Sequence, residues 1–102
     1  MSQWRKNPRI DANQADVVGA LREVGAAVHF IGSPLDLLVA GTHTTGEGRT
    51  MLMEVKNPAT GYGKRGLNEG QQKFVSDWPG LWAQVSDCES AVRAYRVLVG
   101  AA

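Results

Sequence analysis

The sequence predicts an α/β domain in which a small mixed sheet carries helices packed on it. Apolar residues recur at helical spacing in three segments and form short strand-like runs in four others, in the order α-β-β-β-α-β-α. The length of 102 residues fits one domain with a real core. We find no internal repeat or linker, so we predict a single domain over residues 11–102, after a basic polar leader at residues 1–10.

The first helix is predicted within "DANQADVVGALREVG", residues 11–25, because its apolar residues form one stripe and Gly25 supplies a stop. "AAVHFI" follows as a strand, and Gly32, Ser33 and Pro34 end it. "DLLVA", opening at Asp36, is predicted as the second strand. The glycine- and threonine-rich residues 41–50 are expected to form a flexible hairpin loop before a third strand, "MLMEV".

The second half of the chain opens with a glycine-rich loop, "NPATGYGKRG", and then a helix from Leu67 that Asn68 caps. We expect the inward face of this helix to carry residues at helical spacing: Leu67, Gln71, Phe74, Val75 and Trp78. "LWAQV" is the fourth strand. The last helix begins in "SDCESAVRAYRVLVG", where Ser86 and Glu89 stand at capping-box spacing.

Composition narrows the class of protein. With 43% hydrophobic and 21% charged residues and no apolar run of about 18 residues, the chain offers no membrane span. No apolar stretch follows the basic start, so we expect no secretory signal and a cytoplasmic protein. The lone Cys88 cannot form an internal disulfide and is expected to be buried. Trp78 and Trp82 are expected to fill the core rather than to stack on bases.

The net charge of +1 excludes binding to nucleic acid through bulk charge alone. Basic residues are nevertheless grouped in two regions, the leader, which includes Arg9, and the segment around the second helix. Lys64 and Arg65 in the latter would suit backbone phosphates next to a catalytic site, and we add Lys73 and Arg9 as candidate DNA contacts.

The chemistry in the sequence centres on Asp36, Glu54 and Lys56. Residues two apart on a strand share a face, so Glu54 and Lys56 project together. Antiparallel pairing of the two strands would bring Asp36 beside Glu54. Paired carboxylates need a proton, a cation or the lysine to neutralise them, and their hard oxygens suit Mg²⁺ or Mn²⁺. The Lys56 ammonium could orient a metal-bound water or stabilise the negative charge that grows on a phosphodiester during attack. The three residues therefore suit phosphodiester hydrolysis. The alternative is an exposed Glu54–Lys56 ion pair at a strand end.

Taken together, Asp36 before "LLV" and Glu54-Val55-Lys56 at the end of an apolar strand resemble the signature of the PD-(D/E)XK nucleases. The flanking segments "DANQADVVGALREVG" and "LNEGQQKF" are similar to those of small VRR-NUC-like and phage-encoded members. The resemblance implies a restriction-endonuclease-like αβββαβ core with a mixed four-stranded sheet flanked by helices. Leu35 departs from the family pattern, in which proline directly precedes the aspartate.

The resemblance also implies roles for individual residues. Asp36 and Glu54 would bind the metal, the carbonyl of Val55 would add a ligand, and Lys56 would be the catalytic lysine. Gln71 matches a glutamine that lies near the site in this family, although a core glutamine bonded to backbone explains it equally well. Asp11 either completes the metal site or caps the first helix, where it stands three residues before Gln14.

We therefore expect a Mg²⁺- or Mn²⁺-dependent endonuclease that hydrolyses DNA and selects structure such as branches. The small domain has little surface for reading bases, and relatives in this family resemble junction resolvases that act as dimers, so we expect a homodimer in the cytoplasm of a bacterial or phage-infected cell. Two alternatives remain: a non-catalytic nucleic-acid-binding phage accessory protein with the same fold, and a sequence-specific restriction-type nuclease.

Overall fold

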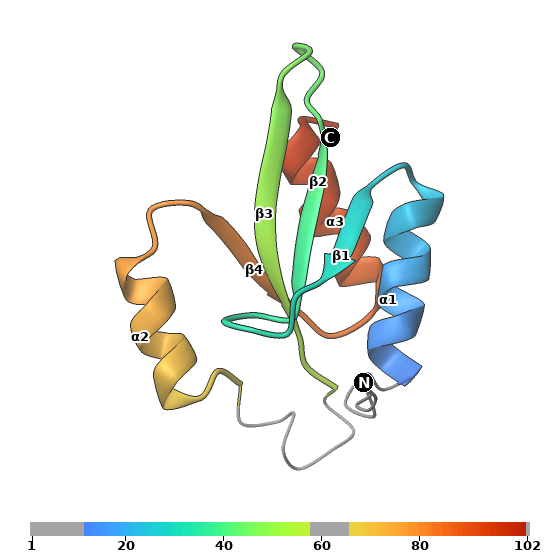
Figure 1. Cartoon of the computed structure of the whole chain (residues 1–102). Helices are drawn as coiled ribbons and strands as arrows, with labels where there is room; N and C mark the ends of the chain where they lie inside the picture. Colours follow the sequence, from blue (N-terminus) through green and yellow to red (C-terminus); the bar gives the residue numbers. More distant parts are fainter. Residues whose placement is uncertain (1–11, 58–65, 102) are drawn as a thin grey trace, which may run out of the picture.

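The fold follows the predicted order of helices and strands (Figure 1). The computed structural model describes residues 12–57 and 66–101. The leader and the predicted phosphate contacts Arg9, Lys64 and Arg65 lie outside these residues, as does Asp11. The described elements are α1 (Ala12–Glu23), β1 (Ala27–Phe30), β2 (Leu37–Thr42), β3 (Gly48–Val55), α2 (Glu69–Asp77), β4 (Leu81–Val85) and α3 (Cys88–Val99).

The strands form one mixed four-stranded sheet in the order β1-β2-β3-β4, which confirms the predicted α/β class. β1 pairs with β2 and β2 with β3 in antiparallel fashion, whereas β4 lies parallel to β3. The parallel step requires a crossover, and α2 lies in that connection. The register pairs Leu37 with Met53, so the start of β2 lies against the end of β3.

One face of the sheet packs on α1 and α3, which also pack on each other. Figure 1 shows both helices on the same side of the molecule, with α3 behind the central strands. The core between these layers includes Leu21 from α1, Val39 and Met53 from the sheet, and Tyr95 from α3, all buried. Burial of each such side chain contributes about 2 kcal/mol, so this layer supplies most of the apolar stabilisation.

Successive side chains of β3 lie on opposite faces of the sheet. Met51 and Met53 belong to the core under α1 and α3, whereas Leu52 and Glu54 are buried without joining that cluster. Because successive side chains of a strand point to opposite sides, Glu54 and Lys56 share the face turned away from α1 and α3. That face carries the candidate site.

Helix α2 stands apart from the other two helices (Figure 1). Asn68 caps it as predicted: its side chain accepts the Gln71 N–H at 2.8 Å, and Gln71 Oε1 accepts the Asn68 N–H at 3.1 Å. None of its residues is fully buried. Four residues of the expected inward stripe are half-buried while Trp78 is exposed, so the stripe marks the less exposed side of the helix but does not enter the core. The helix lies at the side of the sheet, where its apolar residues find few partners.

Both tryptophans of the described chain are exposed, which contradicts their expected place in the core. Trp78 is 39% exposed and Trp82 is 36% exposed. Trp82 lies on β4, an edge strand of the described sheet, where no further strand covers it. Cys88, which we expected to be buried, is half-buried and packs against the core.

The β2–β3 hairpin is longer than predicted, because β2 runs to Thr42 and β3 begins at Gly48. Only residues 43–47 form the turn, closed by the His43 N–H donating to the Glu47 carbonyl at 2.6 Å. The extra length comes from two further ladder pairs, Gly41 with Arg49 and Thr42 with Gly48, which form despite the two glycines.

The cap of α3 lies one residue later than predicted. Asp87, not Ser86, is the N-cap, and its side chain accepts the Ser90 N–H at 2.7 Å. Ser90 Oγ completes the capping box by accepting the Asp87 N–H at 3.2 Å. Glu89 instead reaches Arg93, 3.5 Å away on the helix surface. Ser86 and Asp87 are both of residue types that cap helices, so the backbone conformation, not the residue type, decides which of them is the N-cap.

Candidate functional site: a buried Asp-Glu-Lys cluster

Asp36 is held in place by the chain that leads into β2. The N–H groups of Ile31 and Gly32 both donate to its carbonyl, at 2.9 and 3.1 Å. Leu35 is fully buried beside it. The residue that interrupts the proline-aspartate pattern therefore anchors the turn. Asp36 lies directly before β2, which begins at Leu37, one residue later than predicted.

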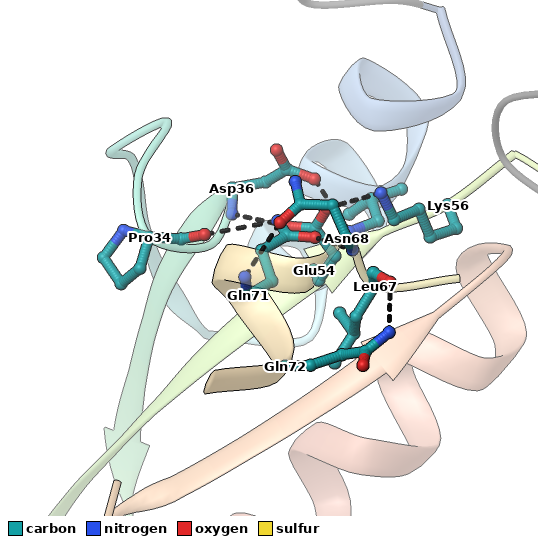
Figure 2. Close-up of polar contacts among 9 residues, drawn as sticks. Pro34, Asp36, Glu54, Lys56, Leu67, Asn68, Gln71 and Gln72 are labelled. Carbon is teal, nitrogen blue, oxygen red and sulfur yellow. Dashed lines mark hydrogen bonds and ion pairs between the residues drawn. The ribbon is translucent and has the colours of Figure 1, made fainter. Parts of the chain in front are cut away.

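Asp36 and Glu54 lie side by side, and each carboxylate accepts a hydrogen bond from a backbone N–H of the other segment (Figure 2). The Asp36 N–H donates to Glu54 Oε1 at 3.1 Å, and the Val55 N–H donates to Asp36 Oδ2 at 2.9 Å. The antiparallel register of β2 and β3 produces this meeting, as the sequence predicted. Each carboxylate is thus oriented by a main-chain donor of the other strand.

Lys56 completes the cluster on the same face of the sheet. Its Nζ lies 3.0 Å from Glu54 Oε2, and the two side chains are 12% and 5% exposed. Glu54 is the one buried charged residue of the described chain. The alternative of an exposed ion pair at a strand end is therefore wrong. A buried carboxylate of this kind requires its cation, since removing either partner leaves an uncompensated charge.

The cluster changes the acidity of Asp36. Burial raises the pKa of its carboxyl from 3.8 to about 6, and the neighbouring Glu54 carboxylate adds to the rise. The Val55 N–H and the Lys56 ammonium oppose it by favouring the charged form. Burial and the neighbouring carboxylate thus both disfavour the charged form of Asp36, and a bound cation would offset both effects.

Gln71 reaches the loop that precedes Asp36, rather than the carboxylates. Its Nε2 donates to the Pro34 carbonyl at 3.2 Å, and its Oε1 takes part in the cap of α2 (Figure 2). The described contacts therefore make it a residue that positions the loop, not one that touches the carboxylates. A polar hollow of about 380 Å³ opens here, lined by Gly32, Ser33, Pro34, Asn68, Gly70 and Gln71.

Several contacts of the site were not anticipated from the sequence. The Val55 N–H, rather than only the Val55 carbonyl considered above, orients Asp36. Asn68 and Pro34 enter the site through Gln71. The Asn68-x-x-Gln71 spacing is the signal that could have revealed their link, because a capping box fixes both side chains.

The remaining candidates are separate from the cluster or outside the described chain. Lys73 is exposed on α2 and lines a second hollow. Arg9, Lys64, Arg65 and Asp11 fall in the parts of the chain that are not described, so the choice between a metal ligand and a helix cap stays open for Asp11.

The donor set bears on the expected Mg²⁺ or Mn²⁺. Within residues 12–57 and 66–101, no group of three or more His, Cys, Asp or Glu side chains gathers as a ligand cage. Asp36 and Glu54 alone provide a pair of hard carboxylates. Mg²⁺ is commonly held by one or two carboxylates together with water and substrate phosphate, so the pair fits such an ion but not a fully protein-bound one.

Comparisons with known proteins do not assign the chain to a family. No protein-family model matches it, and neither a curated protein nor a solved structure is significantly similar. The helices of the described residues are all too short or too polar to span a bilayer. The functional argument therefore depends on the geometry of the cluster.

Proposed function

We propose that the protein is a metal-dependent endonuclease that hydrolyses phosphodiester bonds in DNA and selects branched or junction structures. The observation that supports this most strongly is the meeting of Asp36, Glu54 and Lys56, with Glu54 bonded to both the Asp36 N–H and the Lys56 ammonium. The element order and mixed sheet agree with the restriction-endonuclease-like core that the sequence resemblance implies.

Asp36 and Glu54 would hold the Mg²⁺ or Mn²⁺ ion, with the Val55 carbonyl as a further oxygen donor. The ion would supply an activated water and a Lewis acid for the phosphate. Asp36 is suited to this role because burial raises its pKa, so that a cation nearby replaces a proton. Its carboxyl group keeps its orientation through the Val55 N–H.

Lys56 contributes a positive charge next to the carboxylates. As negative charge grows on the phosphate during attack, an ammonium that is already desolvated and held by Glu54 stabilises it at little reorganisation cost. Gln71 supports the same geometry indirectly, by fixing the Pro34 carbonyl two residues before Asp36. In this proposal Gln71 positions the site and Lys56 acts on the substrate.

DNA and a second copy of the chain are the proposed partners. Cutting both strands of a branch calls for two active sites, which a homodimer supplies. Lys73, together with Lys64, Arg65 and Arg9, would contact backbone phosphates. Sedimentation with and without branched DNA tests the dimer: a monomer under both conditions contradicts it.

A non-catalytic nucleic-acid-binding protein is the second candidate. Both Glu54 oxygens already have partners within the chain, and the described residues hold no third acidic or imidazole ligand. In this alternative the Glu54–Lys56 pair is purely structural. The phage accessory protein considered above belongs to this class.

A cleavage assay separates these functions. The protein is incubated with linear duplex, supercoiled plasmid, single strands and a four-way junction, in Mg²⁺, Mn²⁺ or EDTA. The proposal predicts junction-dependent cutting that EDTA and Lys56→Met abolish. Arg49→Met is the matched control. It also removes an ion pair, Arg49 to Glu47 at 2.8 Å, but that pair is exposed and lies at the opposite end of β3 from Glu54.

The other outcomes assign the alternatives. Binding without cutting in either metal supports the non-catalytic protein and overturns the endonuclease. Discrete fragments from linear duplex, independent of branches, indicate the sequence-specific restriction-type nuclease.

A further inference from the structure

An aromatic pair lies at the C-terminal end of α2, with Trp78 exposed at its C-cap and Phe74 half-buried beside it. Phe74 and Trp78 stack with ring centroids 5.2 Å apart and an angle of 26° between their planes. Trp78 is held in this pose, since its Nε1 donates to the Leu81 carbonyl at 3.4 Å. Gly80 leaves room for the indole, because a Cβ there would lie 2.8 Å from Trp78 Nε1. The exposed indole, backed by the half-buried Phe74 ring, therefore forms a fixed surface.

A hollow of about 340 Å³ lies beside this pair, lined by Gly70, Lys73, Phe74, Asp77 and Trp78. Gly70 also lines the polar hollow at Pro34 and Gln71. The two hollows therefore adjoin along α2. From Gly70 to Trp78 the helix spans about 12 Å, so a ligand that begins at the loop before Asp36 can follow α2 to the aromatic pair.

The charges along this path distinguish its two parts. Lys73 offers a cation for a phosphate, whereas the Asp77 carboxylate beside Trp78 repels one. A nucleobase fits the Asp77 end better, because its face stacks on the indole and its amino groups can donate to a carboxylate. An unpaired nucleotide meets both requirements, whereas bases in an intact duplex are stacked on each other.

We propose that the Phe74–Trp78 surface binds an unpaired base of a nucleic-acid strand, with the adjoining phosphate on Lys73 and the strand continuing along α2 toward Asp36. This inference rests on the proposed function for the identity of the ligand, and it names the feature that would make a branched or single-stranded substrate preferred. It also reverses the sequence-based expectation that Trp78 is a core residue.

The test measures binding in EDTA, so that no cleavage intervenes. Fluorescence anisotropy is recorded with a labelled single-stranded oligonucleotide and with a blunt duplex of the same sequence. Trp78→Leu is expected to weaken single-strand binding about tenfold and duplex binding less than twofold, and Trp78→Phe to restore most of the loss. Lys73→Gln should weaken binding to both.

Matched controls lie elsewhere on the surface. Phe30→Leu removes another exposed aromatic ring, from β1, and Arg93→Gln removes a cation from α3. Both should bind like the wild type. Thermal melting checks that Trp78→Leu stays folded, as expected for a residue of an unburied helix end.

Three results would overturn the inference: no single-strand binding by the wild type, equal binding by Trp78→Leu, or self-association that Trp78→Leu abolishes, which would make the surface an interface with a second copy. The outcomes for the two proposals are separable. If the wild type cuts DNA but Trp78→Leu binds and cuts equally well, only the aromatic site is wrong. If Trp78-dependent binding occurs without cleavage, only the endonuclease is wrong.

Discussion

The two faces of the sheet bury different kinds of side chain. Under α1 and α3, the sheet contributes apolar side chains such as Val39 and Met53, which are wholly buried. On the other face, Glu54 is 3% exposed yet charged, and its partners are Lys56 and the Asp36 N–H. Burial of the apolar side chains lowers the free energy of folding, whereas burial of the Glu54 carboxylate raises it unless Lys56 compensates the charge.

Along a single strand, one residue contributes to the stability of the core and the next contributes to the candidate site. β3 supplies Met53 to the core and Glu54 to the cluster, one residue apart. The apolar layer holds the strand rigidly, so the charged groups on the reverse side keep their positions. Substitutions on the two faces should therefore have distinguishable effects on stability and on cleavage.

The largest expected effect is that of Lys56→Met. It leaves the Glu54 carboxylate buried without its cation, which should lower the free energy of unfolding by about 3 kcal/mol. Under the proposed function, cleavage should also fall about 100-fold or more, because a charge aimed at the phosphate is lost. Denaturant melts and single-turnover cleavage at low temperature measure the two effects.

The double substitution Glu54→Gln with Lys56→Met sharpens this result. It removes both charges, so stability should return nearly to that of the wild type while cleavage stays absent. If Lys56→Met alone melted like the wild type, the pair would be no stronger than a surface ion pair, and the contrast between the faces would fail.

Leu21→Ala should lower stability and leave cleavage unchanged, which is the reverse of the result expected for the double substitution. Leu21 is fully buried between α1 and the sheet, and its truncation should cost about 3 kcal/mol through lost burial and a cavity. Cleavage per folded molecule should be unchanged well below the melting temperature. Specific activity normalised to the folded fraction checks this. A large loss of specific activity would show that the core layer and the cluster are not separable.

Asp36→Asn should stabilise the protein at neutral pH, in contrast to changes in the core. The folded-state pKa of Asp36, about 6, lies above the unfolded value of 3.8, so the contribution of this group to stability is fully present below pH 4 and is lost as pH rises through 6. Asparagine avoids that loss, which we expect to be about 1 kcal/mol after allowance for solvent screening at this half-buried group.

Thermal melting of Asp36→Asn and wild type in EDTA at pH 4 and pH 8 measures this difference. The advantage of the variant should appear at pH 8 and nearly vanish at pH 4. Asp16→Asn, on the exposed surface of α1, controls for loss of an acidic group. An Asp36→Asn variant that is less stable at pH 8 would show that the pocket prefers the carboxylate.

The smallest effect on stability is expected for Gln71→Leu, and its matched control is Ser90→Ala. Each removes one of the two hydrogen bonds of a capping box, on α2 or α3, and should cost about 0.5 kcal/mol. Only Gln71 also bonds the Pro34 carbonyl. Cleavage should therefore fall about tenfold for Gln71→Leu and stay normal for Ser90→Ala. Equal cleavage by the two variants would remove Gln71 from the site.

Periodicity in the sequence predicted that Asp36, Glu54 and Lys56 meet, although it left open whether the Glu54–Lys56 pair is exposed. The two-residue repeat of a strand places Glu54 and Lys56 on one face, and a hairpin connection brings the start of one strand to the end of the next. Those are local rules, and they put Asp36 beside Glu54 without knowledge of the helices. The cap at Asn68 followed from equally local chemistry.

Tertiary packing could not be predicted in the same way. The stripe of α2 looks like a core-facing surface, yet Trp78 remains exposed because α2 lies beside the sheet and not over it. The choice between Ser86 and Asp87 as a cap, and the extension of the hairpin through Thr50, depended on pairing with distant backbone. Such features follow from the whole fold.

The central claim is that Asp36 and Glu54 together bind a divalent cation. Isothermal titration calorimetry with MnCl₂ tests it most directly, because Mn²⁺ shares the oxygen preference of Mg²⁺ and binds more tightly than many hard ions. The account predicts saturable binding by the wild type and by Asp16→Asn, and its loss in Asp36→Asn and in Glu54→Gln. Absence of binding in the wild type, or equal binding by all four proteins, would contradict it.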